Sequence, residues 1–395
     1  MQPDGRRAFL VAAAVMATRA VHAQQRSFTL GLLTQADDER YAPATLQKAL
    51  PDAPGGRAAA AAQVALDDSG FALQGAGWST SRLLPLEAPD AAAVPGALNQ
   101  LLQQGAKHVV LELPVAGVAA AAAAARGRDV ILFNAGAPED ALRGAQCAAN
   151  LLHTLPSHAM QADALAQLLV ARKWNRPVVL VGPLPADRLL LQAWQRSARR
   201  FGVKPVAERA FKLSNDPRER DLGNVRLLTS DREYDAVVVL DAQGEFARDL
   251  PYRTVLPRPV VGSGGLVAQA WHPAHERHGA PQLSRRFQRK AGRSMGSHDW
   301  AVWMAVRAAV EAVSADAKAG IAQQLRALKE GAIALDGYKG QRLTFRAWDG
   351  QLRQPLLLAH GHGVAELAPL EGFLHPASTL DTLGFEGRDS ACKAP

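Results

Sequence analysis

The chain has 395 residues, a formal net charge of +8 and two cysteines. This length is enough for two domains, each with its own apolar core. The basic side chains are scattered and accompany no nucleic-acid-binding motif, so we exclude nucleic acid as a partner and expect the charge to favour small anions.

The N-terminus has the order of a secretory signal peptide. Two arginines at 6–7 precede an apolar run over residues 8–17, and Val21-His22-Ala23 supplies small residues at the cleavage positions. We predict a signal peptide over residues 1–23 and a periplasmic mature protein. The apolar run is too short to cross a bilayer, which takes about 20 residues. Residues 6–10 fit the core of a twin-arginine signal but lack the usual flanking Ser and Lys, so twin-arginine export and general secretion both stay open.

Short apolar runs then alternate with longer helical patterns, which is typical of parallel α/β sheets. In the first half we expect strands over residues 28–33, 72–75, 108–113 and 129–133, and helices over 57–68, 94–104 and 115–126. After a break near residues 150–156 we expect helices over 157–173 and 187–201, and strands over 177–181, 205–211, 236–240 and 259–261. The last third predicts helices over 298–313 and 316–329, then a hairpin around Asp349-Gly350, a favoured hairpin turn.

The restart of the pattern predicts an α/β fold of two doubly wound, Rossmann-like lobes joined by a hinge, with a cleft between them. The helices of the last third need a sheet to cover, so they complete these lobes and the chain crosses between them more than once. The expected division is 27–152 plus about 266–338 for lobe 1, about 153–265 plus 339–378 for lobe 2, and 379–395 for a C-terminal tail.

The spacings of the cysteines and histidines indicate which kinds of site the chain can form. Cys147 and Cys392 are the only cysteines, and in an oxidising compartment an isolated pair indicates one disulfide, which would tie the tail to the first lobe. The alternative is two unrelated thiols. We interpret His272, His275 and His278 as exposed helix or loop residues and predict no metal site. Because no GxSxG, HExxH or phosphate-loop motif is present, we predict a protein that is not an enzyme and uses no catalytic cofactor.

Several segments, in this order, resemble motifs of the type I periplasmic substrate-binding proteins of ABC transporters, the branched-chain amino-acid receptor class. Residues 151–157 resemble that family's first crossover between lobes, 297–301 the start of a late helix, and 335–345 the closing hairpin. The resemblance implies the type I periplasmic-binding-protein fold, a small ligand held between two lobes and an ABC permease as partner. We expect a monomer.

Within that class, residues 134–138, 182–188, 250–254, 271–276 and 371–375 resemble the binding proteins encoded with alcohol dehydrogenase systems that depend on pyrroloquinoline quinone (PQQ). This resemblance implies PQQ, a flat quinone with three carboxylates, as the bound ligand. It also implies a PQQ-dependent dehydrogenase as a further partner.

The sequence also bears on competing ligands. The family's ligand turn has lost its hydroxyls at residues 134–137, and Gly264 stands where an acidic residue is expected. An ammonium group left unpaired would cost roughly a few kcal/mol, so the sequence favours a planar polycarboxylate over a branched-chain amino acid or an alcohol-derived metabolite. An exported accessory protein of the dehydrogenase is a further alternative.

A PQQ site would need arginine forks for the carboxylates and an aromatic plate for the ring. In doubly wound folds such groups lie in loops at the carboxyl ends of strands. The residues that we expect to bind the ligand, with the two tryptophans as plates, are Thr34, Gln35, Asn134, Arg143, His153, Arg188, Asp241, Arg253, Trp271 and Trp300.

Overall fold

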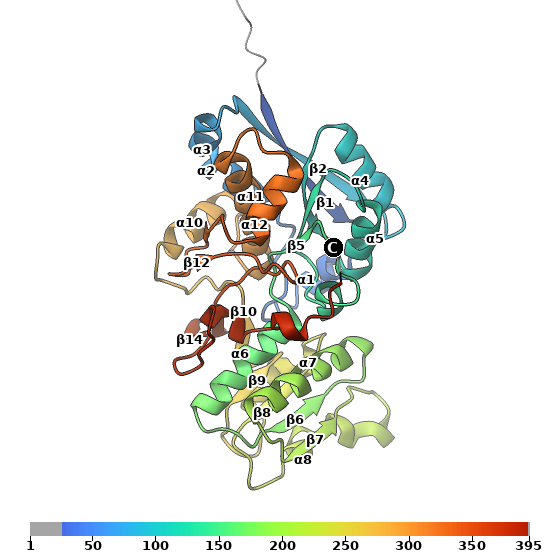
Figure 1. The fold of residues 1–395 in the computed structure, drawn as a ribbon. Coiled ribbons are helices and arrows are strands. Elements are labelled where there is room, and N and C mark those ends of the chain that lie inside the picture. The colour runs from blue at the N-terminus through green and yellow to red at the C-terminus, as the bar shows by residue number, and fades with distance from the viewer. Residues whose placement is uncertain (1–25, 394–395) are drawn as a thin grey trace, which may run out of the picture.

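The computed structural model describes residues 26–393, so the predicted signal peptide lies outside the described residues. Figure 1 shows two α/β lobes, one above the other, with the last third of the chain passing between them. Each lobe is built on its own parallel sheet. Within residues 26–393, none of the helices combines the length and the apolar character that crossing a membrane requires.

The first sheet has five parallel strands in the order β2-β1-β3-β4-β5. These are β1 (Ser27–Gln35), β2 (Thr80–Ala88), β3 (His108–Glu112), β4 (Ile131–Asn134) and β5 (Leu151–His153). Every residue of β3 is buried, because helices cover both faces of the sheet. One face packs on α2 (Ala59–Asp68) and α11 (Ser297–Ala315), and the other on α4 (Val94–Gln103) and α5 (Val115–Ala124).

The second sheet has four parallel strands in the order β7-β6-β8-β9. These are β6 (Val178–Val181), β7 (Ala207–Ala210), β8 (Val237–Leu240) and β9 (Val260–Gly262). One face packs on α6 (His158–Ala171) and α7 (Pro185–Phe201), and the other on α8 (Val225–Leu228) and α9 (Glu245–Asp249). Ser157 caps α6 by accepting a hydrogen bond from the Met160 amide, and Gly202 ends α7 with a φ of 76°.

Smaller elements complete the lobes. An antiparallel sheet joins β10 (Val267–Gln269), β13 (Leu356–His360) and β14 (Gly363–Ala368), and β11 (Leu335–Asp336) pairs with β12 (Arg342–Leu343). The other α-helices are α1 (Pro43–Leu46), α3 (Gly70–Gly75), α10 (Ala280–Ala291) and α12 (Ile321–Lys329). Short 3-10 turns lie at Glu39–Tyr41, Asp140–Arg143, Pro217–Gly223, Leu250–Tyr252, Thr379–Thr382 and Gly387–Asp389.

Two predicted strand positions were wrong, and His272 and His275, which were expected to be exposed, are buried. Residues 72–75 belong to helix α3, and the strand beside β1 is β2 instead. The β2 strand is hard to predict because it contains Pro85, which an edge strand tolerates. The turn at Asp349-Gly350 closes only a single bridge between Phe345 and Leu352, and the long hairpin is formed by β13 and β14.

The apolar cores show where the chain passes between the lobes. Leu155, Ala270 and Leu352 pack in the core of the first lobe, whereas Met160, Ala268 and Leu356 pack in that of the second. Between residues 155 and 356 the chain therefore crosses three times. We propose that the last crossing lies between residues 352 and 356, rather than near the expected 339, because Leu343 and Phe345 pack in the first core.

Two of these crossings lie side by side in what we call the hinge network, formed by Arg143, residues 153–155 and residues 351–354. Gln351 Nε2 donates to the carbonyls of His153 and Leu155, and Gln354 Nε2 donates to the carbonyl of Thr154 at 2.8 Å. Arg143 donates to Gln351 and to the Leu155 carbonyl, both at 2.9 Å. Buried side chains thus replace water as partners for the backbone at the end of β5 and just beyond it.

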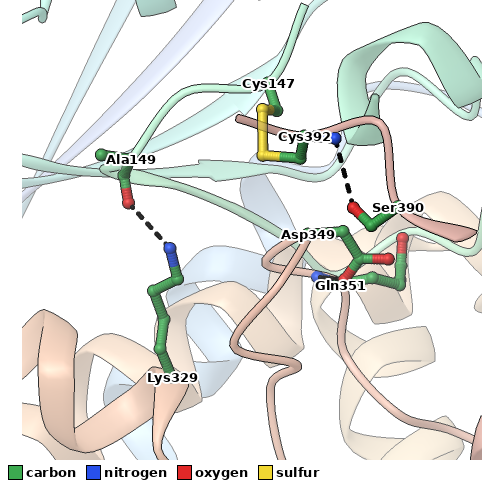
Figure 2. The surroundings of a disulfide bond; sticks show 7 residues. All are labelled: Cys147, Ala149, Lys329, Asp349, Gln351, Ser390 and Cys392. Carbon is green, nitrogen blue, oxygen red and sulfur yellow. Dashed lines mark hydrogen bonds between the residues drawn. A yellow bond between two sulfur atoms is a disulfide. The ribbon is translucent and has the colours of Figure 1, made fainter. Parts of the chain in front are cut away.

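The C-terminal tail lies along the hinge. The buried Asp381 accepts hydrogen bonds from Arg346 at 2.8 Å and from Arg353 at 2.9 Å. Further along, a disulfide joins Cys392 to Cys147 of the first lobe, which is the pairing expected from the sequence. Figure 2 shows this bond close to Asp349 and Gln351, beside the hinge. The tail therefore connects the two lobes a further time.

Candidate ligand-binding cleft

A cavity of about 740 Å³ lies between the two lobes. This volume is in the usual range for small-molecule sites. From the first lobe it is lined within segments 37–54, 114–115 and 138–139 and by Leu155 and His298, and from the second lobe within segments 156–165, 186–194, 240–244 and 262–268. The cavity is therefore shared by both lobes, so that a bound solute would contact both.

Part of the lining is apolar. Leu155, Leu165, Leu190, Trp194 and Val267 border the cavity, and we call this group the apolar wall. Its members come from the crossover after β5, from α6 and α7, and from β10. Trp194 is almost entirely buried, so its ring is held firmly against the neighbouring side chains. The apolar wall can hold the hydrocarbon part of a solute by removing it from water.

Residues 36–56, which we call the bridging segment, run from the end of β1 to the other lobe. Gln161 Nε2 of α6 donates to Asp52 Oδ2 at 2.9 Å, and Lys48 pairs with Glu245 of α9 at 3.6 Å. The Arg248 guanidinium donates to the carbonyl of Lys48. The bridging segment therefore links the lobes directly across the cleft.

Asp52 is the buried end of this bridge. It has a left-handed backbone, with a φ of 59°, and its carboxylate accepts hydrogen bonds from the Ser297 hydroxyl and from Gln161. Burial raises the pKa of Asp52 to about 7, against the opposing effect of these two hydrogen bonds and of the charge on Lys339. The Asp52 carboxyl therefore changes its charge near neutral pH.

The charge of the lining is predominantly acidic. The acidic side chains are Asp37, Asp38, Glu39, Asp52, Glu139 and Asp241, and the cationic ones are Arg40 and Lys48. Arg40 is occupied, because it donates to both carboxylate oxygens of Asp38 and to the carbonyl of Gly136. Although burial opposes it, the hydrogen bonds from Arg40 hold the pKa of Asp38 below its ordinary value. A polyanionic solute would meet mainly like charges here.

Four side chains of the described residues line the cavity with unpartnered polar atoms, and one of these atoms is Nε1 of Trp194 in the apolar wall. Among the residues that the structure describes, Glu139 Oε2, His158 Nδ1 and His298 Nδ1 are buried and have no hydrogen-bond partner. Burial, with a smaller effect of the Arg40 charge, lowers the pKa of His298 to about 3, so its imidazole is neutral. These atoms are available to a solute.

Of the ten residues expected to bind the ligand, Asp241 lines this cavity. Its carboxylate accepts hydrogen bonds from the amides of Phe246 and Ala247 at 2.9 and 3.0 Å, so it also caps the start of α9. The other nine lie elsewhere in the described part of the chain, for three different reasons.

Asn134, Arg143 and His153 are buried and hold loops in place. Asn134 Oδ1 accepts from the amides of Gly136 and Ala137, and its Nδ2 lies 3.0 Å from His153 Nδ1. Arg143 belongs to the hinge network, and burial lowers its pKa to about 10. These side chains shape the loop after β4 and do not border the cavity.

The remaining predicted residues lie at strand ends, on the surface or in the core. Thr34 and the buried Gln35 end β1, and the Gln35 carbonyl accepts from Arg57. Arg188 and Arg253 are exposed. Trp271 and Trp300 stack on each other, 6.4 Å between ring centres, in the core of the first lobe, where Trp300 Nε1 donates to the Gly337 carbonyl. Trp271 borders only a smaller pocket of about 220 Å³.

The cavity-lining residues that the sequence analysis did not predict lie in segments with only weak sequence patterns. The bridging segment contains no periodic apolar pattern, and Glu139 stands five residues beyond the end of β4. His158 follows the Ser157 cap directly, so its place at a helix start was predictable although its role was not. Within residues 26–393, no three His, Cys, Asp or Glu side chains gather as a metal site.

Comparisons with known proteins agree with this arrangement. Residues 87–248 match the family model of periplasmic binding proteins. No curated protein matches the sequence significantly. This family match supports a solute-binding protein rather than an enzyme.

Solved structures match nearly the whole chain. One is a leucine-, isoleucine-, valine-, threonine- and alanine-binding protein from Brucella ovis in the closed conformation, with a TM-score of 0.68, 13% identity and coverage of 94% of this chain and 100% of that one. A substrate-binding protein from Desulfitobacterium hafniense in complex with Leu has a TM-score of 0.65 at 16% identity, with coverage of 86% and 99%. A solute-binding protein from Rhodopseudomonas palustris in complex with 3,4-dihydroxybenzoic acid has a TM-score of 0.63 at 14% identity, with coverage of 84% and 92%. These matches confirm the predicted type I periplasmic-binding-protein fold.

Proposed function

We propose that this protein is the solute-binding component of an ABC transporter and captures a small organic solute between its lobes. The observation that carries the proposal is the cavity of about 740 Å³, which both lobes line and the bridging segment spans. Hinge closure would bury a solute there and present the closed form to a permease. The predicted signal peptide would export the chain to the periplasm, where such capture takes place.

We further propose that the solute is of the size and kind of a branched-chain or similar amino acid. The apolar wall suits a hydrocarbon side chain, and matching folds occur in structures described as binding leucine or an aromatic acid. PQQ, which the sequence resemblance favoured, is a weaker candidate. Its three carboxylates would meet six acidic side chains, and both cations of the lining, Arg40 and Lys48, already have acidic partners.

Calorimetric titration of the mature protein with leucine, 3,4-dihydroxybenzoate and PQQ tests both the solute-binding function and the proposed kind of solute. We expect saturable binding of leucine at one site per chain and no saturable binding of PQQ. Tight binding of PQQ alone would restore the ligand that the sequence favoured. If none of the three binds, and mass spectrometry finds no small molecule released from protein purified from its native periplasm, the solute-binding proposal fails. Co-purification of a dehydrogenase would then favour an accessory role.

A further inference from the structure

The unpartnered atoms of Glu139, His158 and His298 form a group within the cleft. Native proteins leave few buried polar atoms without a hydrogen bond, and the exceptions call for an explanation such as an absent ligand. Here four such atoms, within the described residues, line one cavity: one is Trp194 Nε1 of the apolar wall, and the other three belong to this group. They come from the loop after β4, the first residue of α6 and the second residue of α11. Both lobes therefore contribute to the group.

The loop that carries Glu139 is held firmly against α6. The His158 amide donates to the Pro138 carbonyl at 3.0 Å, and the Ala159 amide donates to Asp140 Oδ1 at 3.0 Å. On the other side, Arg143 donates to the carbonyl of Glu139 at 3.1 Å. The backbone of the loop that carries Glu139 is thus fixed next to the start of α6, which keeps Glu139 at this edge of the cavity.

The charges around this group suit a cationic partner. His298 is 9% exposed and neutral, so it can accept a hydrogen bond through an imidazole nitrogen without adding positive charge. Arg40, the nearest guanidinium in the lining, is held by Asp38 and by the Gly136 carbonyl. The group therefore combines a carboxylate with two imidazoles, of which that of His298 is neutral, and the guanidinium of Arg40 is already paired. A hydrogen-bonded ammonium matches this set, whereas a carboxylate does not.

Gly264 explains why an acid is needed elsewhere. The sequence resemblance placed the acid that would hold an ammonium group at position 264, where this chain has glycine. A Cβ atom at Gly264 would lie 2.4 Å from the carbonyl oxygen of Ala247, so no side chain fits there without a shift of the backbone. In this protein an acid for the ammonium group must come from another position, and Glu139 is on the opposite side of the cleft.

We propose that Glu139, with His158 and His298, forms the site for an ammonium group of the solute, while the apolar wall holds its hydrocarbon part. The proposal rests on the proposed solute-binding function. It adds which part of the cleft binds the ammonium group and which part binds the hydrocarbon group of the solute. It reverses the inference from sequence that an ammonium group would be left unpaired.

Calorimetric titration with three solutes that share one hydrocarbon skeleton tests the site: 3-methylbutylamine, leucine and 4-methylpentanoate. We expect the wild-type protein to bind the amine and leucine but not the acid. Glu139→Gln should weaken binding of both amine-bearing solutes by about 10- to 100-fold, as expected for loss of a hydrogen bond to a charged group. Glu371→Gln, an exposed glutamate outside the cavity, is the matched control and should bind like the wild type.

Each outcome bears on the site separately from the overall function. Unchanged affinity of Glu139→Gln for the amine, or wild-type binding of the acid as tight as that of the amine, overturns the ammonium site but leaves a solute-binding protein. If the wild-type protein binds PQQ but not the amine, the ammonium site is likewise overturned, and the protein is still a solute-binding protein. If Glu139→Gln is unfolded by circular dichroism, His298→Gln provides the second variant, and its expected loss for the amine is about 2- to 10-fold.

Discussion

The two sides of the junction between the lobes are built on opposite principles. On the hinge side, buried charges are paired and the tail adds a covalent link: Arg346 and Arg353 bind Asp381, and Cys147 is joined to Cys392. On the cleft side, the links are a partly exposed ion pair and a few hydrogen bonds from the bridging segment. The hinge can therefore act as a fixed axis, whereas the cleft can open and still keep polar atoms free for a solute.

The largest expected effect comes from breaking the hinge. Asp381→Ala removes the nearer of the two carboxylates that pair with the buried Arg346, at 2.8 Å against 3.9 Å for Asp349, and loss of one partner of a buried pair costs about 3–5 kcal/mol. On the cleft side, Glu245→Ala removes a partly exposed pair and should cost less than about 1 kcal/mol. Urea unfolding of both variants measures the difference. Equal losses in the two variants would contradict the contrast between the two sides.

Removal of the disulfide should have the next largest effect. The double variant Cys147→Ser, Cys392→Ser frees a tail that closes a loop of 245 residues, and we expect a loss of about 2–4 kcal/mol in the free energy of unfolding. Differential scanning calorimetry gives the comparison, with the wild-type protein under a reducing agent as the control. A variant that unfolds like the oxidised wild type would show that the noncovalent contacts of the tail are sufficient.

On the cleft side, loss of a single hydrogen bond should change affinity more than stability. Gln161→Ala removes the donor to Asp52, which links α6 to the bridging segment. We expect binding of the solute to weaken by about 2- to 10-fold, because the closed arrangement loses one hydrogen bond between the lobes. Titration calorimetry together with a thermal melt separates the two effects. A fall in melting temperature without a change in affinity would place Gln161 in the fold rather than in closure.

The smallest effect is a dependence of affinity on pH. The pKa of Asp52 is about 7 in this arrangement, against an ordinary value of 3.8, and the groups that face its carboxyl are Gln161, Ser297 and Lys339. Because the closed cleft favours the protonated carboxyl, affinity should fall as pH rises between these two values and level off above the higher one.

Affinity for a solute that does not itself titrate in this range, measured at pH 6.5 and pH 8, should fall by about 2- to 5-fold. Asp52→Asn keeps an oxygen that can accept both hydrogen bonds but removes the charge, so its affinity should vary less with pH. A variant with the same pH profile as the wild type would exclude Asp52 as the source.

The residues that line the cavity could be predicted from the sequence only in part. Arg143 and His153 follow strands β4 and β5, as ligand residues in such folds often do. The same loops also begin the crossing between lobes, where buried backbone needs side-chain partners, and both residues are used there. Trp271 and Trp300 pack in the apolar core of the first lobe and so do not border the cavity between the lobes. Asp241 lines the cavity, and the loop that contains it does not pass from one lobe to the other.

What the sequence by itself determined is the part that depends on local pattern. Alternating strands and helices specified two parallel sheets, and an isolated pair of cysteines indicated the link between Cys147 and Cys392. Only the tertiary structure decided which polar groups remain unpaired. Arg40 is neutralised by a near neighbour, but Glu139, His158 and His298 are brought together from positions up to 159 residues apart (298 minus 139). The charge of the cleft depends on such long-range pairing, which no local pattern encodes.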